Sequence, residues 1–216
     1  LDVLIALFFR SFGAISAFIL TLVVARQLGA KESGYYFLGY SIIFMLATFS
    51  RVGLSNTVIR YVGANPNYLI SALLKSFFLS GSLSLIITIL LYKNYNFIGI
   101  SLNKPELGIV IKLMSISLLG ITLSTLIANS LQAMHKTKSS IFLISIGVNV
   151  LLIFFVISAT IVDSMKLAGL FSLAVYINAF LSILFFIFLR PKKNKNRNLS
   201  WSKLLSSCLP LWVTTI

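Results

Sequence analysis

The sequence is poor in acidic residues, cysteine and histidine. Only four of its 216 residues are Asp or Glu, and it contains one Cys and one His. A single cysteine excludes an internal disulfide framework, and a single histidine excludes a metal site built from several histidines. The sequence also lacks a phosphate-binding Gly-rich loop and a nucleophile motif. We therefore expect a protein that is not an enzyme and needs no cofactor.

Long apolar runs dominate what is present. Hydrophobic residues make up 58% of the chain, and the mean hydropathy is +1.01. A helix needs ~20 mostly apolar residues to cross a bilayer, whereas a membrane β-barrel would show short alternating segments. The sequence therefore predicts an all-α, polytopic membrane helical bundle with six spans plus the start of a seventh. The predicted spans are 3–25, 35–62, 68–92, 107–134, 139–162 and 167–189, and the seventh begins near Leu204.

The segment 190–203 differs from the rest because it is polar and carries six basic residues. Such a composition is typical of a linker between two helical bundles. We therefore expect an N-terminal six-helix bundle (1–189), a basic cytoplasmic linker (190–203) and the truncated start of a second bundle (204–216). This layout is typical of transporters built from two repeated halves. We accordingly expect the chain to be part of a longer protein.

The net charge of +14 comes from 18 Lys and Arg residues against four acids. No base-reading module accompanies this charge, so nucleic acid is not an expected partner. The basic residues lie mainly between the apolar runs, as topology signals do. Placing the linker in the cytoplasm puts eleven of them on that side and six on the other, which predicts a cytoplasmic N-terminus.

Several short motifs resemble one family of membrane proteins. In segment 25–36 a small-Arg-x-Leu-Gly turn precedes a Gly-Tyr pair that opens the second predicted span. Further matching segments are 49–56, 59–61, 132–136 and Leu209-Pro210-Leu211. Together they resemble the Wzx-type polysaccharide flippases. The span order matches over the whole chain, and the motifs are specific in the first 62 residues.

The resemblance implies a fold of twelve or more spans in two bundles, in the superfamily that also holds multidrug exporters. It implies movement of an undecaprenyl-diphosphate-linked oligosaccharide from the cytoplasmic to the periplasmic leaflet of the bacterial inner membrane. The product would serve cell-surface polysaccharides such as the O-antigen of lipopolysaccharide. The implied partners are membrane lipids, the anionic lipid-linked oligosaccharide and, as a candidate, a polysaccharide polymerase.

Four cations inside predicted spans are candidate substrate-binding residues: Arg10, Arg51, Lys75 and Lys112. A cation deep in the bilayer costs about 2–3 kcal/mol or more unless it is paired or faces water. The predicted spans offer no Asp or Glu for pairing. Arg10 therefore either lines a cavity that meets a diphosphate or extends its long stem to the headgroups. The same headgroup alternative applies to the two lysines, which lie near span ends.

Arg51 and Arg60 are nine residues apart on one predicted helix, about 2.5 turns, so they should point to opposite sides. Arg51 is the deeper of the two, and we prefer it as the cavity residue. Four uncharged polar residues either join helices or contact sugar hydroxyls. They are Asn129, Gln132, Asn149 and Asn178.

Two other functions compete with the flippase. An ion-coupled multidrug-type exporter would need a membrane carboxylate, which these spans lack, and a cation-rich cavity attracts phosphates rather than cationic drugs. A membrane enzyme acting on a lipid carrier would need catalytic carboxylates or a large loop outside the membrane. The predicted loops are short and hold at most one acid each.

Overall fold

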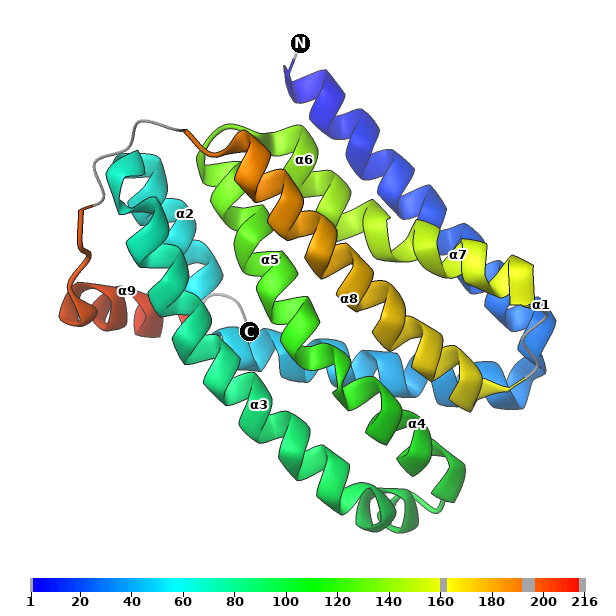
Figure 1. Cartoon of the computed structure of the whole chain (residues 1–216). Helices are drawn as coiled ribbons and strands as arrows, with labels where there is room; N and C mark the ends of the chain where they lie inside the picture. The colour runs from blue at the N-terminus through cyan, green and yellow to red at the C-terminus, as the bar shows by residue number, and fades with distance from the viewer. Residues whose placement is uncertain (1, 160–162, 192–196, 214–216) are drawn as a thin grey trace.

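The computed structural model describes residues 2–159, 163–191 and 197–213, and no strand occurs among them. The all-α class is therefore confirmed for this part of the chain (Figure 1). The elements in chain order are α1 (Asp2–Arg51), α2 (Leu54–Ala64), the 3₁₀ turn η1 (Pro66–Tyr68), α3 (Leu69–Ser101), α4 (Pro105–Ser115), α5 (Ser117–Ala133), α6 (Thr137–Ile141), the π-helical segment η2 (Phe142–Ile146), α7 (Gly147–Ala159), α8 (Ser164–Leu189) and α9 (Trp201–Val213).

Within these described ranges, four helices are long and apolar enough to cross a membrane. They are Ala6–Arg51, Pro66–Ser101, Thr137–Ser158 and Ser164–Leu189. The pair α4 and α5, bent by 45°, makes a fifth if it is one span. A multi-pass membrane protein is thus supported, but six separate spans are not confirmed. The predicted fifth span also ends at 160–162, outside the described residues.

The first predicted loop, between the spans 3–25 and 35–62, is shortened to a single-residue break at Gly29 within α1. Only Gly29, with φ 72° and ψ 178°, departs from helical geometry in this 50-residue element. That combination is essentially restricted to glycine. Two arms, 2–28 and 30–51, diverge from this kink (Figure 1). The first two predicted spans are therefore joined at a single residue.

Two other predicted boundaries are wrong. The span 35–62 is broken at Val52 and Gly53, which both have positive φ, so Arg51 ends α1 while Arg60 lies in α2. The prediction that both arginines share one helix therefore fails. The predicted loop after residue 92 is also mostly helical, since α3 continues to Ser101 with a kink at Asn94.

The helix starts that follow loops carry the expected capping chemistry. Asp163 accepts a hydrogen bond from the Met165 amide at the start of α8, 2.9 Å away. Asn65 accepts one from the Asn67 amide, and Pro105 occupies the first position of α4. These side chains satisfy amides that a helix start leaves unpaired, and proline has no amide to satisfy.

The main core lies where α1, α4, α7 and α8 meet, around Tyr36, Ile43, Met114 and Phe171. The outer surface is apolar as well, with Phe78, Phe97 and Phe188 at least 70% exposed. A soluble protein rarely exposes apolar surface of this extent. Such a surface suits contact with lipid chains.

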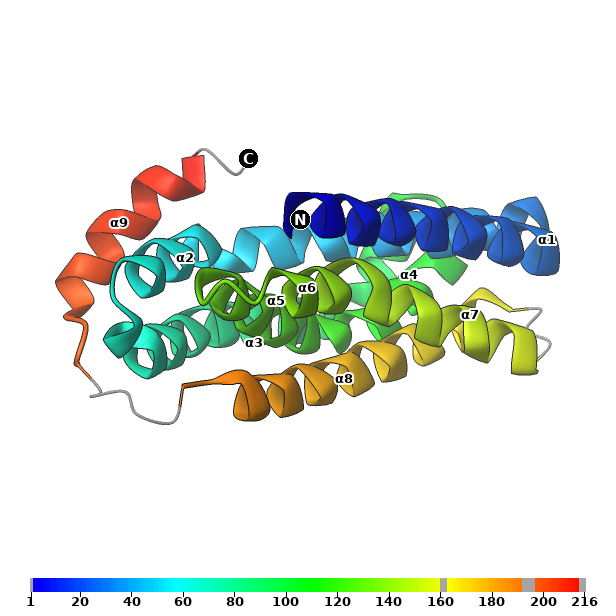
Figure 2. The same cartoon turned by 90° about the horizontal axis from the view of Figure 1, so that it is seen from above.

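Polar contacts connect segments that are distant in the sequence at both ends of the bundle. At one end Lys31 pairs with Glu106 (Nζ to Oε2, 3.1 Å), and Glu32 Oε2 accepts hydrogen bonds from the Ser164 amide and hydroxyl. These contacts bring the starts of α4 and α8 to the α1 kink (Figure 2). At the other end the Arg197 amide donates to the Asn67 carbonyl, 2.9 Å away.

The predicted linker 190–203 is only partly described. Residues 192–196, which include three of its basic residues, lie outside the described ranges. Residues 197–200 are not helical, and α9 begins at Trp201 rather than at Leu204. Leu204 and Cys208 of α9 are buried against Leu54 and Val58 of α2. Residues 214–216 are likewise not described.

Candidate functional site

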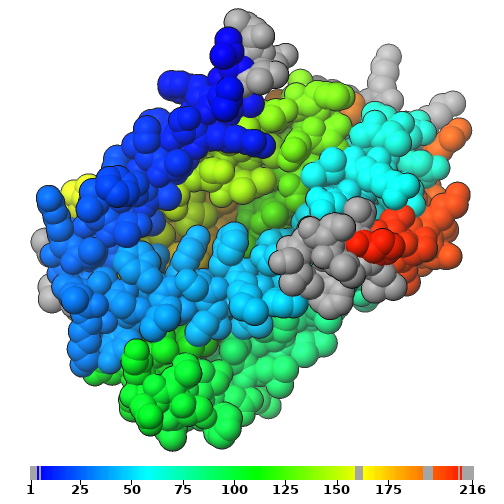
Figure 3. All heavy atoms as spheres, turned by 180° about the vertical axis from the view of Figure 1, so that it is seen from behind, coloured from blue at the N-terminus to red at the C-terminus, as the bar shows by residue number. Residues whose placement is uncertain are grey.

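A cavity of about 460 Å³ opens between the two arms of α1. Figure 3 shows the hollow between the arms, with the segment from α6 to α7 deeper inside. Its walls come from both arms and from α5, η2, α7 and α8. The lining residues are Arg10, Gly13, Ala14, Ala17, Tyr40, Phe44, Arg51, Ile121, Ser124, Thr125, Leu143, Ile144, Ser145, Val148, Asn149, Phe171, Val175 and Asn178.

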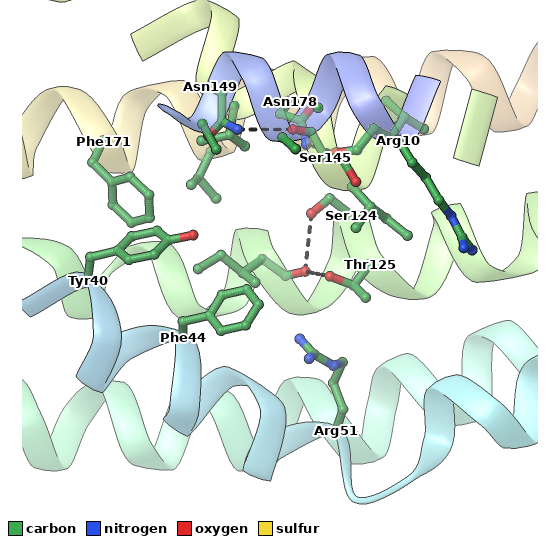
Figure 4. A pocket seen from close by; sticks show the side chains of 18 residues that line it. Arg10, Tyr40, Phe44, Arg51, Ser124, Thr125, Ser145, Asn149, Phe171 and Asn178 are labelled. Atoms are coloured by element: carbon green, nitrogen blue, oxygen red, sulfur yellow. Dashed lines mark hydrogen bonds between the residues drawn. The ribbon is translucent and has the colours of Figure 1, made fainter. Parts of the chain in front are cut away.

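Arg51 reaches this cavity from the last turn of α1 (Figure 4). A cation is favourable at this position because the C-terminal end of a helix carries a partial negative charge. Its Nη2 donates to Thr48 Oγ1 at 3.0 Å, whereas its buried Nη1 has no hydrogen-bond partner among the described residues. The guanidinium is therefore only partly satisfied by the protein.

Arg10 lines the same cavity from the first arm of α1, and its side chain is exposed. The kink at Gly29 makes this possible, because it folds the second arm back beside the first. Two arginines that are 41 positions apart in sequence thus face one space (Figure 4). No acidic residue is among those that line it.

Lys75 and Lys112 do not reach the cavity, and each has protein partners elsewhere. Lys75 Nζ donates to Asn198 Oδ1 and to the Leu199 carbonyl and lies 5.0 Å from the centre of the Trp201 ring. It fastens residues 198–201 to α3. Lys112 Nζ lies 4.2 Å and 4.7 Å from the ring centres of Tyr95 and Tyr92, a cation–π arrangement.

The π-helical segment η2 forms one side of the cavity. Such a segment frees carbonyl groups from the regular helical ladder and often occurs at functional sites. Two carbonyls of this segment accept side-chain hydrogen bonds: Leu143 from Asn178 Nδ2 and Ser145 from Asn149 Nδ2, both at 3.0 Å. Asn178 therefore joins α8 to η2, whereas Asn149 reaches another helix only through Ser16 Oγ on α1, 3.4 Å from its Nδ2. Joining helices is one of the two predicted roles of these residues.

Asn149 and Asn178 differ in burial and in their remaining capacity to form hydrogen bonds. Asn178 is 1% exposed, and its Oδ1 has no partner in the described part of the chain. That oxygen packs directly over Gly147, where an added Cβ would approach it to 2.1 Å. Asn149 is only partly buried and faces the cavity.

Aromatic side chains form the opposite wall, a group that the sequence analysis missed. Tyr40 stacks on Phe44 with ring centres 5.9 Å apart and meets Phe171 edge-on at 5.6 Å. The cavity also contains the overlooked hydroxyl residues Ser124, Thr125 and Ser145. One sequence signal was available, since Tyr36, Tyr40 and Phe44 recur every four residues and so share one face of a helix.

The residues of the cavity are suited to binding a charged and polar ligand. No group of three or more metal-ligating side chains occurs in the ranges that the structure describes. The cavity instead combines two cations, a set of neutral hydrogen-bonding groups and an aromatic wall, and a ligand with an anionic part and a hydroxyl-rich part would complement all three.

The comparison with known families points the same way. The family described as "Polysaccharide biosynthesis protein" matches residues 2–216. No curated protein and no solved structure matches the chain significantly. The match covers nearly the whole sequence and agrees with the resemblance found in the motifs. The chain therefore belongs to the polysaccharide biosynthesis protein family, whose members resemble the Wzx-type flippases.

Proposed function

We propose that the chain is the N-terminal half of a flippase that moves an undecaprenyl-diphosphate-linked oligosaccharide from the cytoplasmic to the periplasmic leaflet. The observation that carries this proposal is the cavity in which Arg10 and Arg51 occur together without an acidic residue. Family membership supports it, because a polysaccharide biosynthesis protein that lacks catalytic motifs is better suited to transport than to catalysis.

The electrostatics of the cavity favour an anionic ligand. A buried cation is costly unless it is paired, and one buried nitrogen of Arg51 has no acceptor among the residues that the structure describes. A diphosphate supplies several acceptor oxygens, and guanidinium groups bind phosphates through paired hydrogen bonds. The same cavity would repel a cationic drug, so the observed charges disfavour the multidrug-type exporter.

The open side of the cavity suits a lipid-linked substrate. The polar head would enter between the two arms of α1 while the polyprenyl chain stays in the bilayer. We propose that each arm crosses the membrane, since each exceeds the ~20 residues that a crossing needs. With the bent pair α4–α5 as one crossing, this yields six crossings, and placing the basic linker in the cytoplasm then places the N-terminus there as well. Transport would proceed by alternating access, as this bundle rocks against a second one.

The decisive test uses the complete protein in proteoliposomes. Transbilayer movement of a fluorescent undecaprenyl-diphosphate oligosaccharide is followed with wild-type protein and with Arg10→Ala and Arg51→Ala. Arg26→Ala is the matched control, because Arg26 lies on α1 but not at the cavity. We expect both cavity variants to lose at least about 90% of transport, the effect of removing roughly 1.4 kcal/mol or more of binding, and the control to retain it.

Two results would overturn the proposal. Full transport in both cavity variants would show that Arg10 and Arg51 do not form an anion site that transport needs. Absence of lipid movement in wild-type vesicles that exchange a cationic dye for protons or sodium would favour an ion-coupled exporter. Insertion of every variant is checked by its yield in the membrane fraction, so that a folding defect is not mistaken for lost transport.

A further inference from the structure

Tyr40 and Asn149 lie at the boundary between the main cavity and a second, smaller cavity, because both residues line both cavities. This inner cavity of about 120 Å³ lies beside the main one and shares Ala17, Tyr40, Val148, Asn149 and Phe171 with it. No arginine lines the inner cavity. The space next to the two arginines thus leads to a second, uncharged compartment.

The aromatic wall offers a flat apolar face at this point. Tyr40 is held between Phe171, which meets it edge-on, and the stacked rings of Tyr36 and Phe44. Phe171 and Tyr36 are buried, whereas Tyr40 and Phe44 remain 37% and 50% exposed. Tyr40 and Phe44 therefore keep exposed aromatic surface at the cavity beside buried aromatic neighbours, and the Tyr40 hydroxyl points into the open space (Figure 4).

Hydrogen-bonding groups lie across from this face. The Asn149 amide nitrogen donates to the Ser145 carbonyl at 3.0 Å and to Ser16 Oγ at 3.4 Å. These bonds orient the side chain and leave its Oδ1 able to accept a hydroxyl. Thr125 and Ser124 lie nearer Arg51 and bond to the Ile121 carbonyl of their own helix (Figure 4). Each hydroxyl keeps lone pairs that can accept a further hydrogen bond.

We propose that this aromatic and amide part of the cavity is a subsite for a sugar ring, with Tyr40 and Phe44 as the stacking face and Asn149 as an acceptor for a ring hydroxyl. The inference rests on the proposed function and divides the cavity into two parts. The arginines bind the diphosphate of the cargo, and the neutral compartment binds one ring of its glycan.

The chemistry of a pyranose matches both walls. One face of the ring carries axial C–H groups that pack on an aromatic side chain, while its rim carries hydroxyls that both donate and accept. Aromatic side chains supply contact area with little rotamer entropy to lose, since each has only two side-chain torsions. A polyprenyl chain would fill the aromatic wall but leave the Asn149 acceptor unused, and such an unmet polar group disfavours that occupant.

The experiment measures binding to the complete protein in nanodiscs with two ligands. One is undecaprenyl diphosphate without a glycan, and the other carries the oligosaccharide. We expect wild type to bind the glycan-bearing lipid more tightly. Phe44→Leu and Tyr40→Leu should reduce that affinity about three- to tenfold, the range expected for loss of an aromatic contact, and leave the glycan-free lipid unchanged. Phe188→Leu, on the exposed outer face of α8, is the matched control.

Each outcome has one meaning. Equal loss for both lipids in Phe44→Leu and Tyr40→Leu, or no loss for either, overturns the sugar subsite while the flippase proposal stands. Wild type that binds both lipids equally well also overturns it. Wild type that binds neither lipid overturns the proposed function itself. Tyr40→Phe serves as the second variant: it keeps the aromatic ring and should keep the preference for the glycan-bearing lipid, and loss of the preference there would contradict the stacking role. Unchanged binding of the glycan-free lipid by Tyr40→Leu shows that this variant is folded.

Discussion

Gly147 and Asn178 meet where the helix α7 begins beside α8. The Asn178 side-chain amide donates to the Leu143 carbonyl of the π-helical segment, and its Oδ1 lies against Gly147 of α7. Only a residue without a side chain fits beneath that oxygen, since an added Cβ would come within 2.1 Å of it. The absence of a side chain at Gly147 thus allows the hydrogen bond from the Asn178 side chain that joins α8 to η2 at the cavity.

Gly147→Ala should therefore lower the free energy of unfolding by about 1–3 kcal/mol, the usual cost of overpacking a closely packed site. Gly169→Ala in α8 is the matched control, because an added Cβ there meets no atom within 4 Å. Unfolding in detergent by a graded denaturant provides the measurement. Equal stability of the two variants would show that Asn178 can move aside at no cost.

At the scale of the element, the kink in α1 decides the shape of the cavity. Gly29 has φ 72° and ψ 178°, whereas Gly34, five residues later, is helical and has no neighbour within 4 Å of an added Cβ. Gly29 thus has a backbone conformation that favours glycine, whereas Gly34 has one that any L-amino acid can adopt. An L-amino acid at Gly29 would be strained by about 1–3 kcal/mol.

Gly29→Ala should consequently destabilise the protein and reduce transport, since the strain is relieved by a change in the angle between the arms. Gly34→Ala should be neutral or stabilising by up to about 1 kcal/mol, because alanine loses less backbone entropy in a helix. Thermal unfolding of both variants in nanodiscs tests the pair. A Gly29→Ala protein as stable as Gly34→Ala would contradict the assigned backbone strain.

A second element-scale feature is the fastening of residues 197–201 to α3. Lys75 binds Asn198 and Leu199, and the Leu199 amide donates to Ser71 Oγ at 3.0 Å. The segment that was predicted to be a flexible linker is held at this end by side chains of one helix. Lys75 has a packing role that its sequence position alone did not indicate.

Lys75→Ala should therefore speed hydrogen exchange of the Leu199 amide by about fivefold to thirtyfold, the factor that loss of roughly 1–2 kcal/mol of local protection produces. Lys93→Ala, at an exposed position of the same helix, should leave this exchange unchanged. If both variants exchange alike, Lys75 does not hold the segment.

At the scale of the whole molecule, alternate turns gather at opposite ends. The Lys31–Glu106 pair and the Glu32–Ser164 bonds bring together turns that are distant in the sequence. The short helix α6, which follows the turn after α5 and contains Lys138, belongs to the opposite end in the proposed topology. The proposed topology therefore predicts that the α1 kink and the starts of α4 and α8 face one side of the membrane and that Lys138 faces the other side.

Single cysteines at Lys104 and Lys138, in a Cys208→Ser background, test this statement in cells. Both positions are exposed. A maleimide that cannot cross the inner membrane should label Lys104→Cys from the periplasm and should label Lys138→Cys only after the cells are opened. The reversed pattern would invert the proposed orientation, and labelling of both from one side would contradict the alternation of crossings.

Much of this architecture followed from the sequence, and the reason is physical. The length and hydropathy of a run decide whether it can cross a bilayer, because every backbone amide and carbonyl in the hydrocarbon must be satisfied within the helix. The boundary between the first two spans followed from the same pattern, because the kink at Gly29 falls between the predicted spans 3–25 and 35–62. The break at Val52 and Gly53, inside the predicted span 35–62, was not recognisable, because the apolar composition of a run does not specify its backbone dihedral angles.

The sequence by itself determined that the chain is a helical membrane protein of the polysaccharide biosynthesis family, rich in cations and nearly free of acids. These properties depend on composition, run length and short motifs. Only the tertiary structure decided that Arg10 and Arg51 line one cavity while Lys75 and Lys112 are engaged elsewhere. Proximity of distant residues depends on how helices pack, and in a chain that is apolar on every face, sequence periodicity does not reveal which faces meet.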